Sequence, residues 1–134
     1  MSNKILEKES AWIAQFEWFE NWQERYQFII EQGRSLAGIP ENERNEDMLV
    51  KGCQSLVWLD TKVENNILCL RADSDAMIVK GLIAIIVDIY QGASTSDIKA
   101  YDHGFAKRLG LDAHLSPARA NGLFSIIARI KNSV

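Results

Sequence analysis

The chain has 134 residues, of which 47% are hydrophobic and 25% charged, and its formal net charge is −3. This composition is typical of one globular domain, and the negative charge argues against a nucleic-acid-binding protein, which usually carries a basic face. Two cysteines are too few for a secreted disulfide framework, no apolar signal segment opens the chain, and its most apolar run, residues 82–87, is far shorter than the ~20 residues of a membrane helix. We therefore expect a single domain over residues 1–134 that works in the reducing cytoplasm, without membrane or nucleic acid as partners.

Two helices are predicted in the first part of the chain. Residues 3–18 place apolar side chains at helical spacing. Asn21, followed three residues later by Glu24, has the form of a capping box for a second helix, and Gly33 is a suitable C-cap for it. The polar residues 38–47 are expected to form a connecting loop.

The middle of the chain predicts a small antiparallel sheet. Residues 55–61 and 66–72 are rich in β-branched, aromatic and aliphatic side chains and are expected to pair across a turn at 62–65. Residues 48–50 are expected to add a short third strand. Successive residues of a strand face opposite sides, and we interpret the mid-strand Cys69 as a buried, structural thiol.

A long apolar helix is predicted next. Asp73 or Ser74 is a good N-cap for it, and the helix is expected to end near Gln91. Gly81 lies inside this helix at a cost of ~1 kcal/mol relative to alanine. We interpret that glycine as a sign of close packing against the sheet or against a partner.

Shorter helices are expected in the last third of the chain. One begins near Ser94, another spans residues 105–109, and Ser116-Pro117 is a clear start signal for the last helix. The predicted fold is therefore α+β, with a small antiparallel sheet of about three strands and helices packed on one side of it.

Cys53 is the one credible reactive group that the sequence offers. Gly52 before it permits a sharp turn, and the polar Gln54 and Ser55 after it provide hydrogen bonds that can stabilise a thiolate. The competing interpretation is a small core residue, which is how many free cysteines are used. The sequence holds no glycine-rich phosphate loop, no Cys-x-x-Cys pair and no metal-ligand spacing. A thiol without a helper acid–base set suits sulfur exchange better than hydrolysis.

Three segments of the sequence resemble the SufE family of sulfur-acceptor proteins, which includes the closely similar CsdE branch. The segments G-C-Q-S-L-V-W at residues 52–58 and D-S-D-A-M-I-V-K-G at 73–81 stand in the order and spacing of that family. The segment H-L-S-P-A-R-A-N-G-L at 114–123 is similar to the family's C-terminal part. The resemblance covers nearly the whole chain and implies the same α+β fold, without separating the two branches.

The resemblance implies a sulfur carrier rather than an enzyme. Such proteins accept sulfane sulfur from the persulfide of a pyridoxal-phosphate cysteine desulfurase (of the SufS or CsdA kind), stimulate that enzyme, and pass the sulfur to an iron–sulfur assembly scaffold or another acceptor. On this chain the acceptor is Cys53, with supporting roles for Gly52, Gln54, Asp75 and Arg119. No bound cofactor or metal is expected, since the pyridoxal phosphate belongs to the desulfurase.

A persulfide needs protection from oxidants and other thiols, so we expect Cys53 to rest against an apolar pocket and to swing out on the Gly52 hinge beside Val57 and Trp58. Three other interpretations stay open. Cys53 is incidental to a small binding or regulatory module; or it forms a redox pair with Cys69, which requires Cα atoms within ~7 Å; or the chain is itself a cluster scaffold, for which two cysteines supply too few ligands.

Overall fold

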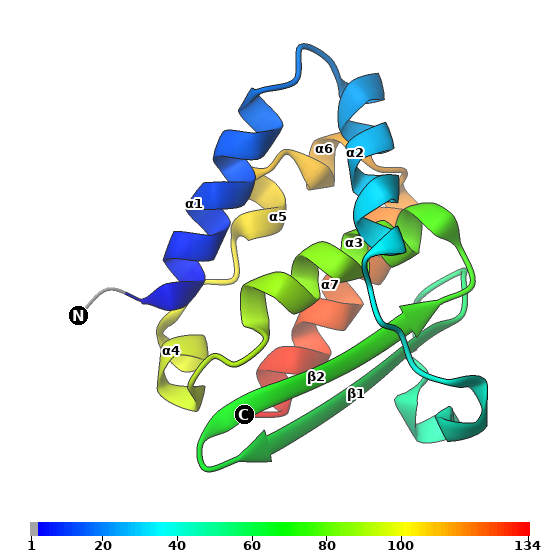
Figure 1. Cartoon of the computed structure of the whole chain (residues 1–134), viewed down its shortest axis with the longest axis vertical. Coiled ribbons are helices and arrows are strands. Elements are labelled where there is room, and N and C mark those ends of the chain that lie inside the picture. Colours follow the sequence, from blue (N-terminus) through cyan, green and yellow to red (C-terminus); the bar gives the residue numbers. More distant parts are fainter. Residues whose placement is uncertain (1–2) are drawn as a thin grey trace.

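The computed structural model describes residues 3–134 as a β-hairpin with helices on one side of it (Figure 1). The α+β class predicted from the sequence is confirmed. The elements in chain order are α1 (Lys4–Glu17), α2 (Trp22–Arg34), two 3-10 turns η1 (Glu41–Glu43) and η2 (Glu46–Met48), strands β1 (Val57–Glu64) and β2 (Ile67–Ser74), and helices α3 (Met77–Tyr90), α4 (Thr95–Ala100), α5 (Phe105–Arg108), α6 (Leu111–His114) and α7 (Pro117–Asn132).

The sheet is a two-stranded antiparallel hairpin formed by β1 and β2. Asn65 and Asn66 make its turn with φ angles of 52° and 62°, a left-handed conformation that asparagine tolerates. The turn is therefore tighter and later than the predicted one at 62–65. The predicted third strand at 48–50 is wrong, because η2 occupies most of this segment and only Leu49 forms an isolated bridge to β1.

The two faces of β2 differ in exposure. Leu68, Leu70 and Ala72 are buried against the helices. Cys69 faces the other way and is exposed, so the interpretation of Cys69 as a buried, structural thiol is wrong. The physical reason is that an antiparallel sheet needs cover on one face only, and here the helices leave the outer face around Cys69 in water.

Helix α3 starts later than predicted. Strand β2 continues through Ser74, so neither Asp73 nor Ser74 caps the helix, and the N-cap is Ala76, which makes no side-chain bond there. Asp73 is instead buried, accepts a hydrogen bond from the backbone nitrogen of Ile39 at 3.0 Å, and pairs with Arg44 at 3.0 Å. The carboxylate thus joins the incoming segment 39–44 to the end of the hairpin.

Two glycines mark the crossing of α2 and α3. A Cβ on Gly81 would lie 2.0 Å from the carbonyl oxygen of Ile29, and one on Gly33 would lie 2.9 Å from the backbone nitrogen of Gly81. The close packing predicted at Gly81 is confirmed, but the neighbour is α2 rather than the sheet or a partner. The prediction that Gly33 caps α2 is wrong, since the helix runs on to Arg34 and Ser35 is its C-cap.

The other predicted helix starts are confirmed. Asn21 caps α2 by accepting a bond from the backbone of Glu24 at 2.9 Å, and Ser94 and Ser116 cap α4 and α7 in the same way. Helix α6 is a short element that the sequence pattern did not predict. Gly110, with φ of 78°, separates it from α5.

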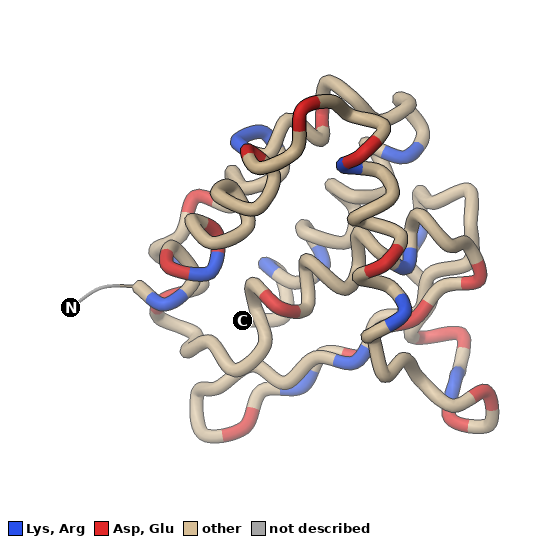
Figure 2. The backbone as a smooth tube through the Cα atoms, turned by 45° about the horizontal axis from the view of Figure 1, so that its top comes forward, with Lys and Arg blue, Asp and Glu red and all other residues tan. Residues whose placement is uncertain are grey.

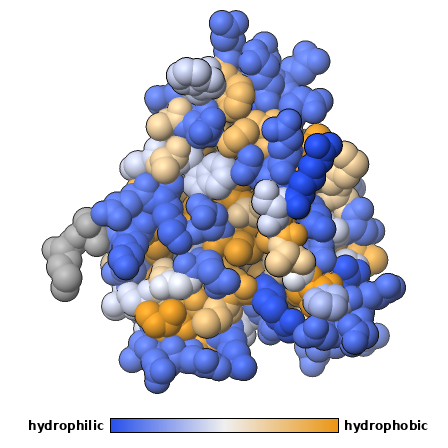
Figure 3. Space-filling model, in the orientation of Figure 1, coloured by the Kyte–Doolittle hydropathy of each residue, from blue (hydrophilic) through white to orange (hydrophobic). Residues whose placement is uncertain are grey.

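The surface carries charges of both signs. Figure 2 shows acidic and basic positions interspersed along the helices and the hairpin. Hydrophobic residues come to the surface in the middle of the face shown in Figure 3, where a groove of about 550 Å³ lies between α1, α2, α3 and β2. Among the residues that line this groove there is no cysteine or histidine, so the candidate chemistry lies elsewhere. Within residues 3–134 no helix has the length and apolar character that crossing a membrane requires.

Candidate functional site

Cys53 lies on the loop between η2 and β1, and this loop rests directly on α7. Gly52 has a φ of 91°, which residues with a side chain rarely adopt, and a Cβ there would lie 2.8 Å from Oγ of Ser125. On the helix side, a Cβ on Gly122 would lie 3.2 Å from Sγ of Cys53. One glycine in the loop and one in the helix therefore allow the thiol to approach the backbone of α7.

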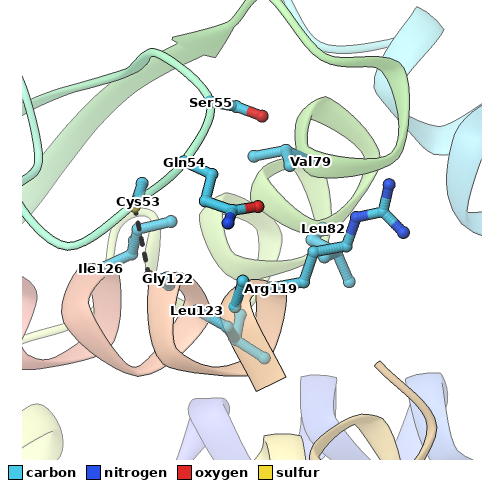
Figure 4. Close-up of a pocket in the computed structure, with 10 residues that line it drawn as sticks. Cys53, Gln54, Ser55, Val79, Leu82, Arg119, Gly122, Leu123 and Ile126 are labelled. Carbon is cyan, nitrogen blue, oxygen red and sulfur yellow. Dashed lines mark hydrogen bonds between the residues drawn. The ribbon is translucent and has the colours of Figure 1, made fainter. Parts of the chain in front are cut away.

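A small cavity of about 90 Å³ lies next to Cys53 (Figure 4). The expected apolar pocket is present, but its walls are not the residues beside the loop, Val57 and Trp58. Its walls come from two helices and from the loop itself. The apolar lining consists of Val79 and Leu82 from α3 and of Leu123 and Ile126 from α7, and Gln54 and Ser55 complete it from the loop.

The environment of Cys53 keeps its thiol uncharged. The side chain is half-buried, and Sγ lies 3.7 Å from the carbonyl oxygen of Gly122, to which the thiol donates. Burial raises the pKa of Cys53 above its ordinary value of 9.0, because an apolar environment favours the neutral form. Since the thiolate is the nucleophile, Cys53 in this position is protected and poorly reactive at neutral pH.

We expect Cys53 in the native chain to react with iodoacetamide more slowly at neutral pH than the same cysteine in denaturant. The uncharged thiol stabilises the closed loop fully below the unfolded pKa of 9.0, and this contribution is lost as the pH rises through the higher folded pKa. The native rate should therefore keep rising above pH 9, where the denatured rate levels off. Intact mass after timed alkylation of a Cys69→Ser chain, from about pH 6 to 11, measures both profiles. Coincident profiles would show that the thiol is not buried in solution.

The end of β2 holds the C-terminal side of the Cys53 loop. Oγ of Ser74 donates to the carbonyl oxygen of Leu56 at 2.8 Å, and Oδ1 of Asp75 accepts a bond from the nitrogen of Leu56 at 3.1 Å. Asp75, selected through the family resemblance, thus lies against the loop that carries Cys53. Ser74 is a contributor that the sequence did not reveal, because a serine in this position has the pattern of a helix cap.

Gln54 and Arg119 both line the cavity, but they are oriented differently. Figure 4 shows the side chain of Gln54 reaching from the loop into the space beside Cys53. The side chain of Arg119 leaves the first turn of α7 and extends past Leu82, so that its guanidinium points away from Cys53. Arg119 is therefore placed at the outer rim of the site, where an approaching molecule would meet it.

The remaining candidate groups lie away from Cys53. Cys69 is on the outer face of the hairpin, whereas Cys53 is on the side of the helices, so the structure does not bring the two thiols together. His103 bonds to the hydroxyl of Tyr90 at 2.6 Å, and His114 stacks on a tryptophan of α2 at 4.0 Å. Within the described part of the chain, no group of three His, Cys, Asp or Glu side chains is placed to hold a metal ion.

Comparison with known proteins relates the chain to one family. Residues 10–134 match the family model described as "SufE: Fe-S metabolism associated domain". The chain is 41% identical over 125 residues to an uncharacterized SufE-like protein of Rhizobium meliloti (strain 1021), covering 90% of this chain and 89% of the relative. It is 40% identical over 124 residues to another from Rhizobium etli (strain ATCC 51251), covering 89% and 84%. The solution structure of a hypothetical protein from Thermus thermophilus matches with a TM-score of 0.76 over 94% of this chain and 92% of that one; its 21% identity makes this a likeness of fold.

Proposed function

The chain belongs to the SufE family, whose domain is associated with sulfur transfer in iron–sulfur metabolism, and from this premise we propose that Cys53 accepts sulfane sulfur from a cysteine desulfurase. The observation that supports this most directly is the half-buried Cys53, next to a hinge glycine and an apolar cavity of about 90 Å³. A carrier needs a thiol that is protected at rest and can be presented to a partner, and this arrangement provides both.

The transfer is an exchange between a thiolate and a persulfide. The Cys53 thiolate attacks the outer sulfur of the persulfide on the desulfurase, and a new S–S bond forms while the S–S bond on the desulfurase breaks. The desulfurase cysteine leaves as a thiolate, and the outer sulfur keeps its proton on Cys53. No electrons are gained or lost overall, so neither an oxidant nor a reductant takes part. A second exchange of the same kind passes the sulfur onward.

The burial of Cys53 sets the order of events. In the closed position the raised pKa of the thiol and the apolar walls disfavour attack. Docking of the desulfurase turns the loop outward about Gly52, so that Cys53 leaves the apolar walls and ionises more readily. When the loop returns, the cavity shields the new persulfide from other thiols.

The neighbouring residues assist in this scheme. Gln54 orders the loop beside the thiol, and Asp75 limits how freely the loop opens through its bond to Leu56. Arg119, at the rim of the site, meets the partner or the transferred sulfur. None of these three forms or breaks a covalent bond; the covalent step belongs to Cys53.

The partners follow from this chemistry. The donor is a pyridoxal-phosphate cysteine desulfurase, and that cofactor stays on the donor. The recipient is an iron–sulfur assembly scaffold or another sulfur acceptor. By removing the persulfide, the protein also speeds turnover of the desulfurase. We place these steps in the cytoplasm, where thiols such as Cys53 and Cys69 remain reduced.

Intact-protein mass after incubation with a cysteine desulfurase and cysteine tests the proposal. The wild-type chain and Cys69→Ser are expected to gain about 32 Da, one sulfur atom, and Cys53→Ser is expected to gain nothing. The gain should disappear on treatment with a reducing thiol, since a persulfide is reducible.

The same experiment separates the other interpretations. A gain that requires both cysteines would indicate a redox pair rather than a carrier. No gain on the wild-type chain with several desulfurases would refute sulfur acceptance and leave the chain as a binding or regulatory module of the same fold.

A further inference from the structure

One arginine of α7 binds the segment that leads into the Cys53 loop. Nη1 of Arg129 donates to the carbonyl oxygens of Met48 at 3.0 Å and Leu49 at 2.8 Å, and Nη2 donates to the carbonyl oxygen of Asp47. These three carbonyls are consecutive and lie at the end of η2, where backbone oxygens lack partners within the helical turn. A single guanidinium thus satisfies the end of this turn and ties it to α7.

The position of Arg129 on α7 relates it to the thiol. Gly122 and Ser125 of the same helix lie against Cys53 and Gly52, and Arg129 follows at helical spacing, so the three residues form one stripe along α7. The stripe therefore contacts the Cys53 loop at the thiol, at the hinge glycine and at the segment before it.

The loop is held at both ends by separate contacts. Arg129 fixes its N-terminal side through Leu49, and Ser74 fixes its C-terminal side through Leu56. Only residues 50–55 lie between these two attachments. A short segment between fixed ends has fewer open conformations than a long one, so each attachment favours the closed position of Cys53.

We propose that Arg129 is a positioning residue for sulfur transfer, which holds the segment 47–49 on α7 and so confines the movement of Cys53 to residues 50–55. This inference rests on the proposed function for its role in transfer, and on the contacts of Arg129 for its effect on the loop. Arginine suits the task because its planar fork presents several donors at once, whereas the single ammonium of lysine reaches fewer carbonyls.

Alkylation of Cys53 in the absence of any desulfurase tests the proposal. All chains carry Cys69→Ser, and the variants are Arg129→Met, which keeps the apolar stem, and Arg129→Lys, which keeps the charge. The control is Arg25→Met, since Arg25 also donates to two backbone carbonyls, of Phe16 at 2.9 Å and Phe19 at 3.1 Å, but in the connection between α1 and α2. Thermal unfolding of each chain and hydrogen exchange of residues 50–56 are measured in parallel.

Arg129→Met is expected to raise the alkylation rate of Cys53 about tenfold at a temperature well below unfolding, which corresponds to about 1.4 kcal/mol lost from the closed state. Hydrogen exchange of residues 50–56 should rise with it. Arg129→Lys should give a smaller increase, and Arg25→Met should leave the rate within about twofold of the parent even if it lowers the melting temperature to a similar extent.

An unchanged Cys53 rate in Arg129→Met, or an equal increase in Arg25→Met, would overturn the proposal, because the effect would then be absent or merely one of global stability. If Arg129→Met does not fold, the comparison of Arg129→Lys with Arg25→Met decides in the same way. Failure of the proposed function looks different: Cys53 would gain no sulfur from a desulfurase, while its alkylation would still respond to Arg129.

Discussion

Stimulation of a cysteine desulfurase is expected to disappear completely when Cys53 is replaced by serine. A serine hydroxyl is not ionised at neutral pH and cannot carry a sulfane sulfur, so the persulfide stays on the desulfurase and blocks its next turnover. The release of alanine from excess cysteine measures turnover without relying on the fate of the sulfur. The rate with Cys53→Ser should equal that of the desulfurase alone, and Cys69→Ser should stimulate as the wild-type chain does, because Cys69 is on the outer face of the hairpin.

The serine variant should also act as a competitor. Serine is close to cysteine in size, and the contacts of Gly52 and Leu56 that shape the loop do not involve the thiol. Docking is therefore retained, and an excess of Cys53→Ser is expected to reduce the stimulation given by the wild-type chain. If Cys53→Ser instead stimulates as strongly as the wild type, binding alone activates the enzyme and Cys53 is incidental.

Local signals predicted much of the fold because their physical cause lies within a few residues. The caps at Asn21, Ser94 and Ser116 depend on a side-chain oxygen and a backbone nitrogen two or three residues later. The alternation along β2 predicted correctly that Leu68 and Leu70 lie on one face. These contacts need no knowledge of the rest of the chain.

The errors arose where a distant segment decides between two local possibilities. Asp73 and Ser74 have the chemistry of helix caps, but Ile39, Arg44 and Leu56 engage them from elsewhere in the chain. The burial of β2 on one face only, rather than on both, depends on how the helices pack, and the sequence near Cys69 holds no trace of this.

The candidate site shows the same division. Cys53 and Gly52 were found because a thiol after a glycine is a local pattern, and Asp75 and Arg119 came only through the family resemblance. Gly122 and Arg129 were missed. A glycine inside the last helix is a signal of close approach, just as Gly81 is, but the sequence does not say which residue approaches it.

Replacing Gly81 with alanine is expected to lower the free energy of unfolding by about 2–3 kcal/mol. Alanine gains up to about 1 kcal/mol in helix propensity, but its Cβ would lie 2.0 Å from the carbonyl oxygen and 2.6 Å from the carbonyl carbon of Ile29. Both atoms belong to the backbone of α2 and cannot rotate away, so the two helices must move apart and the core between them loosens. Urea unfolding should show the loss at an unchanged m-value, and the melting temperature should fall by roughly 6–10 °C.

Gly122→Ala is the matched control, because it introduces the same atom into another helix interior. Its Cβ would lie 3.2 Å from Sγ of Cys53, which ends a side chain on a movable loop and can yield by a small shift. The stability of Gly122→Ala should therefore stay within about 1 kcal/mol of the wild type, while the alkylation rate of Cys53 rises as the thiol is pushed from α7. An equal loss of stability in both variants would mean that the tight crossing of α2 and α3 at Gly81 is not what sets the cost. An unchanged stability in Gly81→Ala would mean that the two helices are not in close contact there.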